Sequence, residues 1–541
     1  MLRVALTVYI AALITRCTGE ALTNAQKKDC SFGNCLSERN DSCPPGFGSE
    51  PCECKALQYN GIYKCDSTRA YVLRGYWVGK CSDGSICTGN CPLGFCTYND
   101  TFNQALPENE DELEEYICGS RRQGVLCGEC RPNYSVSYHS YTYMCTSNTL
   151  CNLGILFYLI SELIPLTIMF VVVMVSNVSF TCGALNGFIL FAQLQDSLAV
   201  HGNGVVRHVP SEQKFVIAFY RLIYRFFNFE FFSIEQMSFC LWRNAKVLDA
   251  MAFKYVTIAY ALVLVLICIF VMSQSKIRKV FKCLRPKSLR SATIHGLTTF
   301  FVMCYSQCAR VSIQILGPMQ LFKRGPEYAE SVVFRSGQLE VFELEHLKYA
   351  IPAILFVCLM LIPPPLILIL YPLSYKILAL CKLSEAKPVN CISKYIPIQL
   401  LDSFQSCFKD EFRFFAGLYF LYRLATLVAF VACRNLTEFY TVLELLLIGA
   451  LALHSVVQPY KERWHNVVDS LLLANLAIIN GISLYHFILV VEGTDSNIEV
   501  NYTHFTVALQ LILLYLPLVG IAIAICPKIY KVVKIIVLLK T

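Results

Sequence analysis

Nine apolar stretches restrict the fold of this chain more than any other feature. A helix needs about 20 apolar residues to cross a bilayer. The stretches are Asn152–Val175, Cys182–Val200, Tyr255–Met272, Ala292–Leu316, Tyr349–Tyr371, Phe414–Cys433, Tyr440–Val457, Val467–Val491 and Phe505–Cys526. With 55% hydrophobic and only 16% charged residues, the chain is too apolar for a soluble protein of 541 residues. We therefore predict an all-α polytopic membrane bundle of about nine transmembrane helices with a small disulfide-rich N-terminal ectodomain.

The loop between the third and fourth stretches predicts how the bundle is oriented. Lys276–Arg290 holds seven basic residues and no acidic one, and short loops of this kind stay in the cytosol. Nine spans then leave the N-terminus extracellular and the C-terminus cytosolic, in a multi-pass protein of the plasma membrane. A nucleic-acid patch is the alternative, but the flanking apolar runs favour a juxtamembrane role. The net charge of +8 thus indicates a lipid bilayer as partner and no nucleic acid.

The N-terminal part divides into a signal and a cysteine-rich segment. Arg3, the apolar run Val4–Ile14 and the small residue Gly19 are typical of a cleavable secretory signal. The predicted parts are a signal peptide over 1–19, an extracellular or luminal cysteine-rich domain over 20–151, a transmembrane domain over 152–526 and a basic cytosolic tail over 527–541.

Fifteen of the 28 cysteines lie between Cys30 and Cys151, where a secreted chain oxidises its thiols. Because fifteen is odd, one thiol is free or pairs elsewhere, and Cys240 in the next external loop supplies a partner. We predict a disulfide between stalk and loop. Zinc or redox chemistry at Cys127 and Cys130 is the less favoured alternative, and no metal site is predicted. The candidate disulfide cysteines are Cys118, Cys127, Cys130, Cys145, Cys151 and Cys240.

Sequons for N-glycosylation provide a test of the predicted orientation. In this topology Asn177 lies inside and stays unmodified, while the external candidates are Asn40, Asn99, Asn133, Asn435 and Asn501.

The sequence does not decide the conformation of three segments. Gly183 and Gly187 predict that the polar second stretch packs closely against another helix. Phe215–Phe232 is interfacial, re-entrant or spanning. Pro363–Pro365 either break the fifth span and expose carbonyls to a ligand path, or form a kink packed against neighbouring helices.

Polar residues inside apolar spans are costly and therefore suggest function. They predict a buried ion-pair network between helices, which serves either as structural glue or as a path for a conducted or coupling ion. The candidate residues are Gln307, Arg310, Gln314, Arg423, Glu444, His454, Asp469 and Asn475. The turn between the seventh and eighth spans is expected to put Tyr460 and Trp464 in the lipid interface.

The sequence carries no Walker loop, HExxH, GxSxG or dinucleotide fingerprint. We therefore expect no enzyme, no catalytic residues and no cofactor, with an intramembrane hydrolase as the disfavoured alternative.

Several motifs resemble a large, mostly uncharacterised family of invertebrate multi-pass membrane proteins with a cysteine-rich stalk. They are Arg69–Gly79, Cys91–Cys96, Cys118–Cys130, Gly183–Ala192 and Tyr460–Asn480. Asn133 stands where that family usually has Gly, which predicts an altered turn. More distantly, the nine-span architecture and the turn Pro459–Lys461 resemble transient-receptor-potential-like proteins, and this resemblance implies a channel or lipid-handling role.

Two functional classes follow from these features. The first is a channel- or transporter-like protein with its path among the fourth to eighth spans. The second is a cell-surface receptor or adhesion protein whose ectodomain binds an extracellular ligand or protein partner and whose segment Tyr375–Glu411 signals. The polar residues and the short internal loops favour the first class.

Overall fold

The computed structural model describes part of the chain. The described residues are 62–65, 70–72, 76–80, 86–92, 95–96, 104–105, 114–115, 117–119, 121–138, 143–176, 181, 183–201, 224, 227, 239–274, 289–322, 328–333, 335–380, 398–433, 436–492, 505–506 and 508–520. Several predictions fall outside them, namely the signal peptide, the basic tail, the loop Lys276–Arg290 apart from its last two residues, Asn40, Asn99, Asn177, Asn435 and Asn501.

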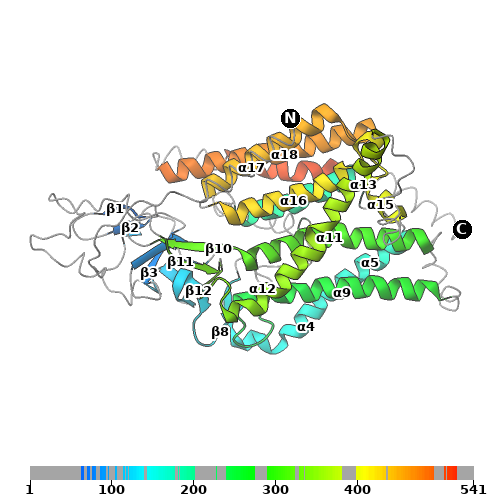
Figure 1. Ribbon diagram of the computed structural model, residues 1–541. Coiled ribbons are helices and arrows are strands. Elements are labelled where there is room, and N and C mark those ends of the chain that lie inside the picture. Colours follow the sequence, from blue (N-terminus) through cyan, green and yellow to red (C-terminus); the bar gives the residue numbers. More distant parts are fainter. Residues whose placement is uncertain are drawn as a thin grey trace, which may run out of the picture. The chain divides into compact units, whose positions relative to one another are not determined.

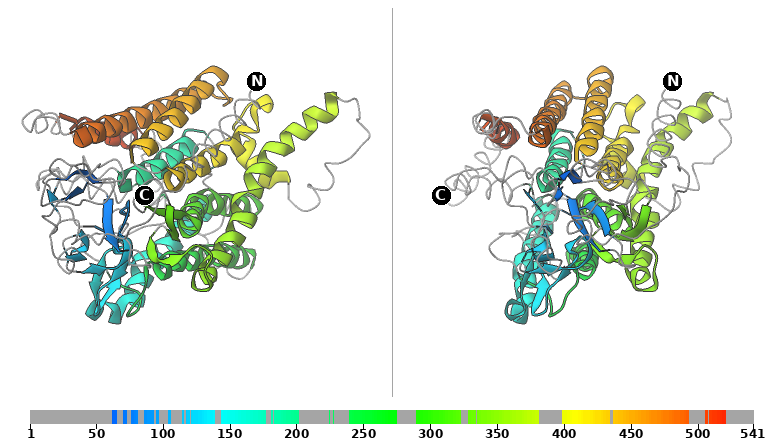
Figure 2. Two further views of the ribbon diagram at one scale, coloured as in Figure 1. Left: turned by 60° about the vertical axis from the view of Figure 1, so that its left-hand side comes forward. Right: turned by 90° about the vertical axis from the view of Figure 1, so that its left-hand side faces the viewer.

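The chain divides into two compact units. The first comprises Met1–Pro132, Leu316–Leu347 and Phe430–Arg434, and the second Asn133–Ile315, Lys348–Ala429 and Asn435–Thr541. Strands dominate the described part of the first unit and helices that of the second (Figure 1, Figure 2). Residues 133–151 belong to the second unit, and the loop after the helix α11 (Leu289–Leu316) belongs to the first.

A five-stranded antiparallel sheet is the centre of the first unit. Its order β12-β11-β10-β4-β3 joins two distant chain segments, since β10 pairs with β4 at Phe322 and Thr88. Trp77, Val78 and Leu321 are buried beside it. The strands are β3 (Tyr76–Lys80), β4 (Ile86–Asn90), β10 (Pro318–Phe322), β11 (Tyr328–Val333) and β12 (Ser336–Glu340).

Short strands accompany this sheet. They are β1 (Ile62–Cys65), β2 (Ala70–Val72) and β5 (Gln104–Ala105) in one small sheet, and β6 (Arg122–Gln123) with β7 (Glu129–Cys130) in another. In the second unit, β8 (Tyr134–Val136) pairs with β9 (Cys145–Ser147).

Disulfides and a buried arginine stabilise the first unit. Cys91 is bonded to Cys96 and Cys118 to Cys127, while Cys130 is also disulfide-bonded. Arg122 Nη1 donates a hydrogen bond to the Cys127 carbonyl at 2.8 Å, and its guanidinium lies 3.7 Å from the centroid of the Phe95 ring. Burial and the nearby Arg335 lower the pKa of Arg122 to about 9.

Six helices of the described residues are long and apolar enough to cross a membrane. They cover Asn148–Met174, Val247–Val271, Leu344–Leu373, Asp410–Ala429, Glu438–Val457 and Arg463–Tyr485. Each overlaps one predicted span, which supports a multi-pass membrane protein. Of the other three predicted spans, two form the helices α6 and α11, which carry many buried polar residues, and the third contains the shorter apolar helix Ala508–Gly520.

The bundle is built from α-helices with two π-helical turns. They are α4 (Gly154–Tyr158), η4 (Leu159–Leu163, π), α5 (Ile164–Ser176), α6 (Gly183–His201), α9 (Val247–Ser273), α11 (Leu289–Leu316), α12 (Leu344–Phe356), η7 (Val357–Leu361, π), α13 (Pro363–Leu380), α15 (Ile398–Gln405), α16 (Phe415–Ala432), α17 (Leu436–Val457) and α18 (Arg463–Glu492). The helices α17 and α18 form a hairpin (Figure 1), and α6 packs on α18.

The prolines of the fifth span form a packed kink. Pro365 and Pro372 lack the N–H groups that would bond the carbonyls of Leu361 and Leu368. Instead, Tyr305 OH donates to the Leu361 carbonyl at 3.0 Å. Gln405 Nε2 likewise donates to the Leu368 carbonyl at 2.8 Å. Both carbonyls are satisfied by side chains of neighbouring helices, which favours the packed kink over a ligand path at these two positions.

Only Tyr224 and Phe227 of the aromatic segment 215–232 are among the described residues. Tyr224 is buried, its ring lies 6.1 Å from that of Phe188 on α6, and its hydroxyl donates to the Leu514 carbonyl at 2.7 Å. At these positions the segment packs against the bundle.

Candidate functional site

The turn between α17 and α18 fixes Tyr460 inside the protein. Asn466 accepts a hydrogen bond from the Tyr460 N–H at 2.9 Å and donates to its carbonyl at 3.0 Å. The ring of Phe408 stacks on Tyr460 at 4.7 Å. Tyr460 is therefore fully buried, which corrects its expected position in the lipid interface, whereas Trp464 is exposed.

Tyr460 begins a chain of buried polar groups. Its hydroxyl donates to the hydroxyl of Tyr419 at 3.2 Å, and Tyr419 donates to Asp469 Oδ2. His454 Nδ1 lies 3.6 Å from the same carboxyl oxygen and 3.4 Å from the Tyr419 hydroxyl. We call Tyr419, His454, Tyr460 and Asp469 the Tyr–His–Asp cluster. It joins α16, α17 and α18, and all four side chains are buried.

Glycines of α6 let this helix approach the cluster. A β-carbon at Gly187 would lie 2.0 Å from Asp469 Oδ1, and one at Gly183 would lie 2.5 Å from the His465 ring. Gly183 also has a positive φ of 65°, a conformation that glycine adopts without strain. These approaches confirm the close packing expected from the two glycines, and they identify α18 as the partner.

Arg423 lies one helical turn after Tyr419 on α16 and is 1% exposed. Its Nη2 donates to Asn186 Oδ1 of α6 at 3.3 Å, and its guanidinium lies 5.2 Å from the centroid of the Phe420 ring. Its Nε and Nη1 have no hydrogen-bond partner among the described residues. The expected ion-pair network does not join Arg423 to Glu444, because Glu444 faces α18 and accepts from Asn480 at 2.8 Å.

The remaining candidates occupy other parts of the bundle. Asn475 donates to the Leu513 carbonyl at 2.7 Å. On α11, Gln307 and Gln314 are buried and Arg310 is half-buried. The predicted network is therefore divided into separate groups, since different helix faces carry its members.

Polar contacts between α6 and α11 explain why these two helices are less apolar than the six long ones. Ser306 donates to Gln193 Oε1 at 2.7 Å, and Gln193 Nε2 donates to the Val302 carbonyl at 3.3 Å. Side-chain amides and hydroxyls thus satisfy one another inside the bundle.

Several buried polar residues were not among the predicted network. Tyr419 and Asn186 are central to the sites above, although Asn186 was one of the polar residues that set the second stretch apart, and Glu162 is 2% exposed in the π-helical turn η4 of the first span. The sequence did contain a signal for Glu162, because an acidic residue within an apolar run is rare. Tyr419 gave no such signal, since tyrosine is common in membrane helices.

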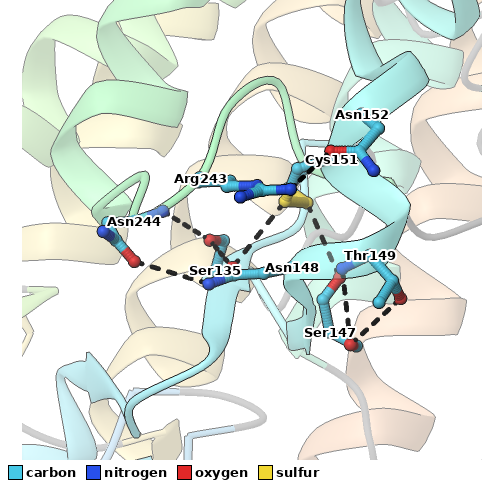
Figure 3. The surroundings of a disulfide bond; sticks show 9 residues. Ser135, Ser147, Asn148, Thr149, Cys151, Asn152, Arg243 and Asn244 are labelled. Carbon is cyan, nitrogen blue, oxygen red and sulfur yellow. Dashed lines mark hydrogen bonds between the residues drawn. A yellow bond between two sulfur atoms is a disulfide. The ribbon is translucent and has the colours of Figure 1, made fainter.

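A second polar group, outside the bundle core, holds the loop after α6 against the stalk (Figure 3). A disulfide joins Cys151 to Cys240, which is the stalk-to-loop bond expected from the odd cysteine count. Arg243 Nη2 donates to Asn152 Oδ1 at 3.0 Å, and the Asn244 N–H donates to Ser135 Oγ at 2.7 Å. We call these contacts the stalk clamp.

One group of three described side chains has the proximity of metal ligands. The sulfur atoms of Cys91, Cys96 and Cys127 lie within 4.8 Å of one another. All three belong to disulfides, so they offer no thiolate to a metal.

No family model, curated protein or solved structure matches the chain. The Tyr–His–Asp cluster and the environment of Arg423 are therefore interpreted from their own geometry.

Proposed function

We propose that the protein is a transporter-like membrane protein in which the Tyr–His–Asp cluster binds and releases a proton as a solute crosses among the fourth to eighth spans. The observation that supports it is the burial of a carboxyl and an imidazole around one tyrosine hydroxyl. Chains of Asp, Glu and His inside membrane helices serve as proton relays in transporters and pumps.

The cluster offers two protonation states with different contacts. Asp469 Oδ2 accepts from Tyr419 and lies beside His454 Nδ1, so a proton on the imidazole turns this contact into an ion pair. Loss of that proton leaves the hydrogen bond from Tyr419. Because Asp469 also lies against Gly187, this change of protonation acts on the contact between α6 and α18.

A route for the proton follows the hydroxyl groups. Lys461 and Glu462 are exposed directly after buried Tyr460, and from Tyr460 the hydrogen bonds run through Tyr419 to Asp469. With the predicted orientation, this turn faces the cytosol, as Lys276–Arg290 does.

Reconstituted protein tests the proposal. Liposomes with an entrapped pH dye receive, in turn, gradients of inorganic cations, inorganic anions, amino acids and carboxylates. We expect one gradient to drive proton movement in the wild type, at least 10-fold less movement in Asp469→Asn, and wild-type movement in Glu438→Gln, which alters an exposed acid of α17. Proton movement that is absent with every gradient, or that persists in Asp469→Asn, contradicts the proposal.

A receptor or adhesion protein is the second candidate. The observation that favours it is the five-stranded sheet, in which the loop after α11 and the N-terminal segment form one folded unit. We propose that this unit is extracellular, with the protein in the plasma membrane. Cell binding that depends on this unit, together with no solute-driven proton movement, would favour this candidate over the first.

A further inference from the structure

The guanidinium of Arg423 is a buried cation without an opposite charge in contact. Among the described residues it forms no ion pair, and its one hydrogen bond goes to the neutral amide of Asn186 at 3.3 Å. An unpaired ion inside a protein carries a penalty of several kcal/mol. Arginine does not escape that penalty by losing its proton, since its pKa in water is far above neutrality.

Among the described residues, neither Asp469 nor Glu444 pairs with Arg423, and Asp469 Oδ1 has no hydrogen-bond partner. Asp469 accepts from Tyr419, and Glu444 accepts from Asn480. A water molecule offers an acceptor but no charge. What the site lacks is therefore a negative charge with hydrogen-bond acceptors.

One aromatic ring lies beside the charge, and three others pack against that ring. Phe420 lies under the guanidinium, and Tyr305 packs on Phe420 at 4.8 Å with Phe301 and Phe404 beside it. Tyr305 OH donates to the Leu361 carbonyl, so the surroundings of Arg423 combine aromatic rings with the phenol groups of Tyr305 and Tyr460. A ligand at this place gains from an apolar or aromatic group attached to its charge.

From these contacts we infer that Arg423 is the binding residue for a small organic monocarboxylate. One guanidinium balances one negative charge, and its planar donors match the two oxygens of a carboxylate. Inorganic phosphate brings excess charge, and chloride brings no second acceptor and no apolar group. Arg423 follows Tyr419 by four residues on α16. The carboxylate site therefore lies about 6 Å along the helix from the proton site.

The inference deepens and rests on the proposed function, for which it names the substrate class. One carboxylate at Arg423 and one proton at the Tyr–His–Asp cluster move no net charge together. We therefore expect that the gradient able to drive proton movement is the carboxylate gradient, and that an imposed membrane potential does not change the rate.

Equilibrium binding tests the site without any gradient. The full chain in lipid nanodiscs is titrated with benzoate, chloride and phosphate at constant pH and ionic strength, and the thermal midpoint and heat of binding are recorded. Benzoate is expected to bind at least 10-fold more tightly than either inorganic anion. Arg423→Gln should abolish this binding, and Arg423→Lys, which keeps the charge without the planar fork, should weaken it about 10-fold.

The matched control is Arg413→Gln, the same change at an arginine that is partly exposed and paired with Asp402 and Asp410. It should bind benzoate as the wild type does. Arg423→Lys supplies the test if Arg423→Gln does not fold. Benzoate binding unchanged in the Arg423 variants, or equal binding of chloride, overturns the inference.

The two proposals fail separately. If benzoate binds through Arg423 but proton movement is the same in Asp469→Asn as in the wild type, the carboxylate site is supported and proton coupling is wrong. If proton movement requires Asp469 but benzoate does not bind, the substrate assignment alone is wrong.

Discussion

At Gly187 the absence of a side chain decides how α6 meets α18. The space that a β-carbon would take is occupied by Asp469 Oδ1, at 2.0 Å from its ideal position. Since Asp469 is held from the other side by Tyr419, it has little freedom to move away. The position of one carboxyl therefore depends on a glycine of another helix.

We expect Gly187→Ala to destabilise the protein by about 1–3 kcal/mol, because an inserted methyl group overpacks a filled contact. Thermal unfolding of the purified protein in detergent measures it. Gly449→Ala is the control, since a β-carbon there meets nothing within 4 Å, and removing a helical glycine should stabilise by about 0.5–1 kcal/mol. Equal effects of the two substitutions would contradict the packing described here.

Asn133 adopts a backbone conformation that few residue types favour. Its φ of 71° lies in the left-handed region, which glycine and asparagine adopt more readily than other residues. Asparagine therefore suits this position as glycine would. The side chain is exposed, which leaves it accessible for the predicted glycan.

At the scale of elements, the stalk clamp connects a strand pair, a loop and the start of the first span. Backbone bonds add to the disulfide, since the Val136 N–H donates to the Ala245 carbonyl at 3.1 Å and the Tyr138 N–H to the Phe239 carbonyl at 2.9 Å. A β-carbon at Gly154 would collide with the Cys240 carbonyl. The disulfide, these hydrogen bonds and this close approach together fix the position of the loop on the stalk.

Cys240→Ser is expected to lower the free energy of unfolding by about 4 kcal/mol, because the disulfide closes a long loop, with a separation of 89 residues. It should also add one titratable thiol at Cys151. Calorimetry and thiol titration measure the two effects, and Cys358→Ser, which removes an exposed free thiol, serves as control. Unchanged thiol titration and unchanged electrophoretic mobility in Cys240→Ser would argue against the bond.

The helices were more predictable than their contacts. The bounds of α16, α17 and α18 follow within about four residues from apolar runs, because the bilayer imposes length and hydrophobicity locally, whereas α9 begins at Val247, eight residues before the predicted span. Arg423, His454 and Asp469 stood out by the same rule. Their partners did not, because rotation of one helix against another decides whether Tyr419 or Glu444 faces a given charge. Strands β10–β12 were missed, since pairing with β4 is a contact between distant segments.

For the whole molecule, the sidedness of the loops is the property that both candidate functions share. The loop after α11 forms three strands of the cysteine-rich unit, and in the proposed orientation this unit lies on the oxidising side. The same orientation puts the basic loop Lys276–Arg290 on the other side.

Sequons inserted into the two loops test this orientation. We expect a glycan on a sequon between β10 and β11, at residues 323–327, and none on a sequon within Lys276–Arg290, because only the first loop meets the glycosylation machinery. A mobility shift removed by glycosidase reports the modification. A glycan on the basic loop would invert the orientation.

The five-stranded sheet combines strands from two distant segments of the chain, and this has a consequence for biosynthesis. The edge of β4 emerges from the ribosome long before its neighbour β10 exists, and four predicted spans must be inserted in between. Until β10 is made, this edge of β4 has no partner strand, and unpaired strand edges invite aggregation. A fragment that stops before the first span lacks β10, β11 and β12, so this edge of β4 would stay unpaired.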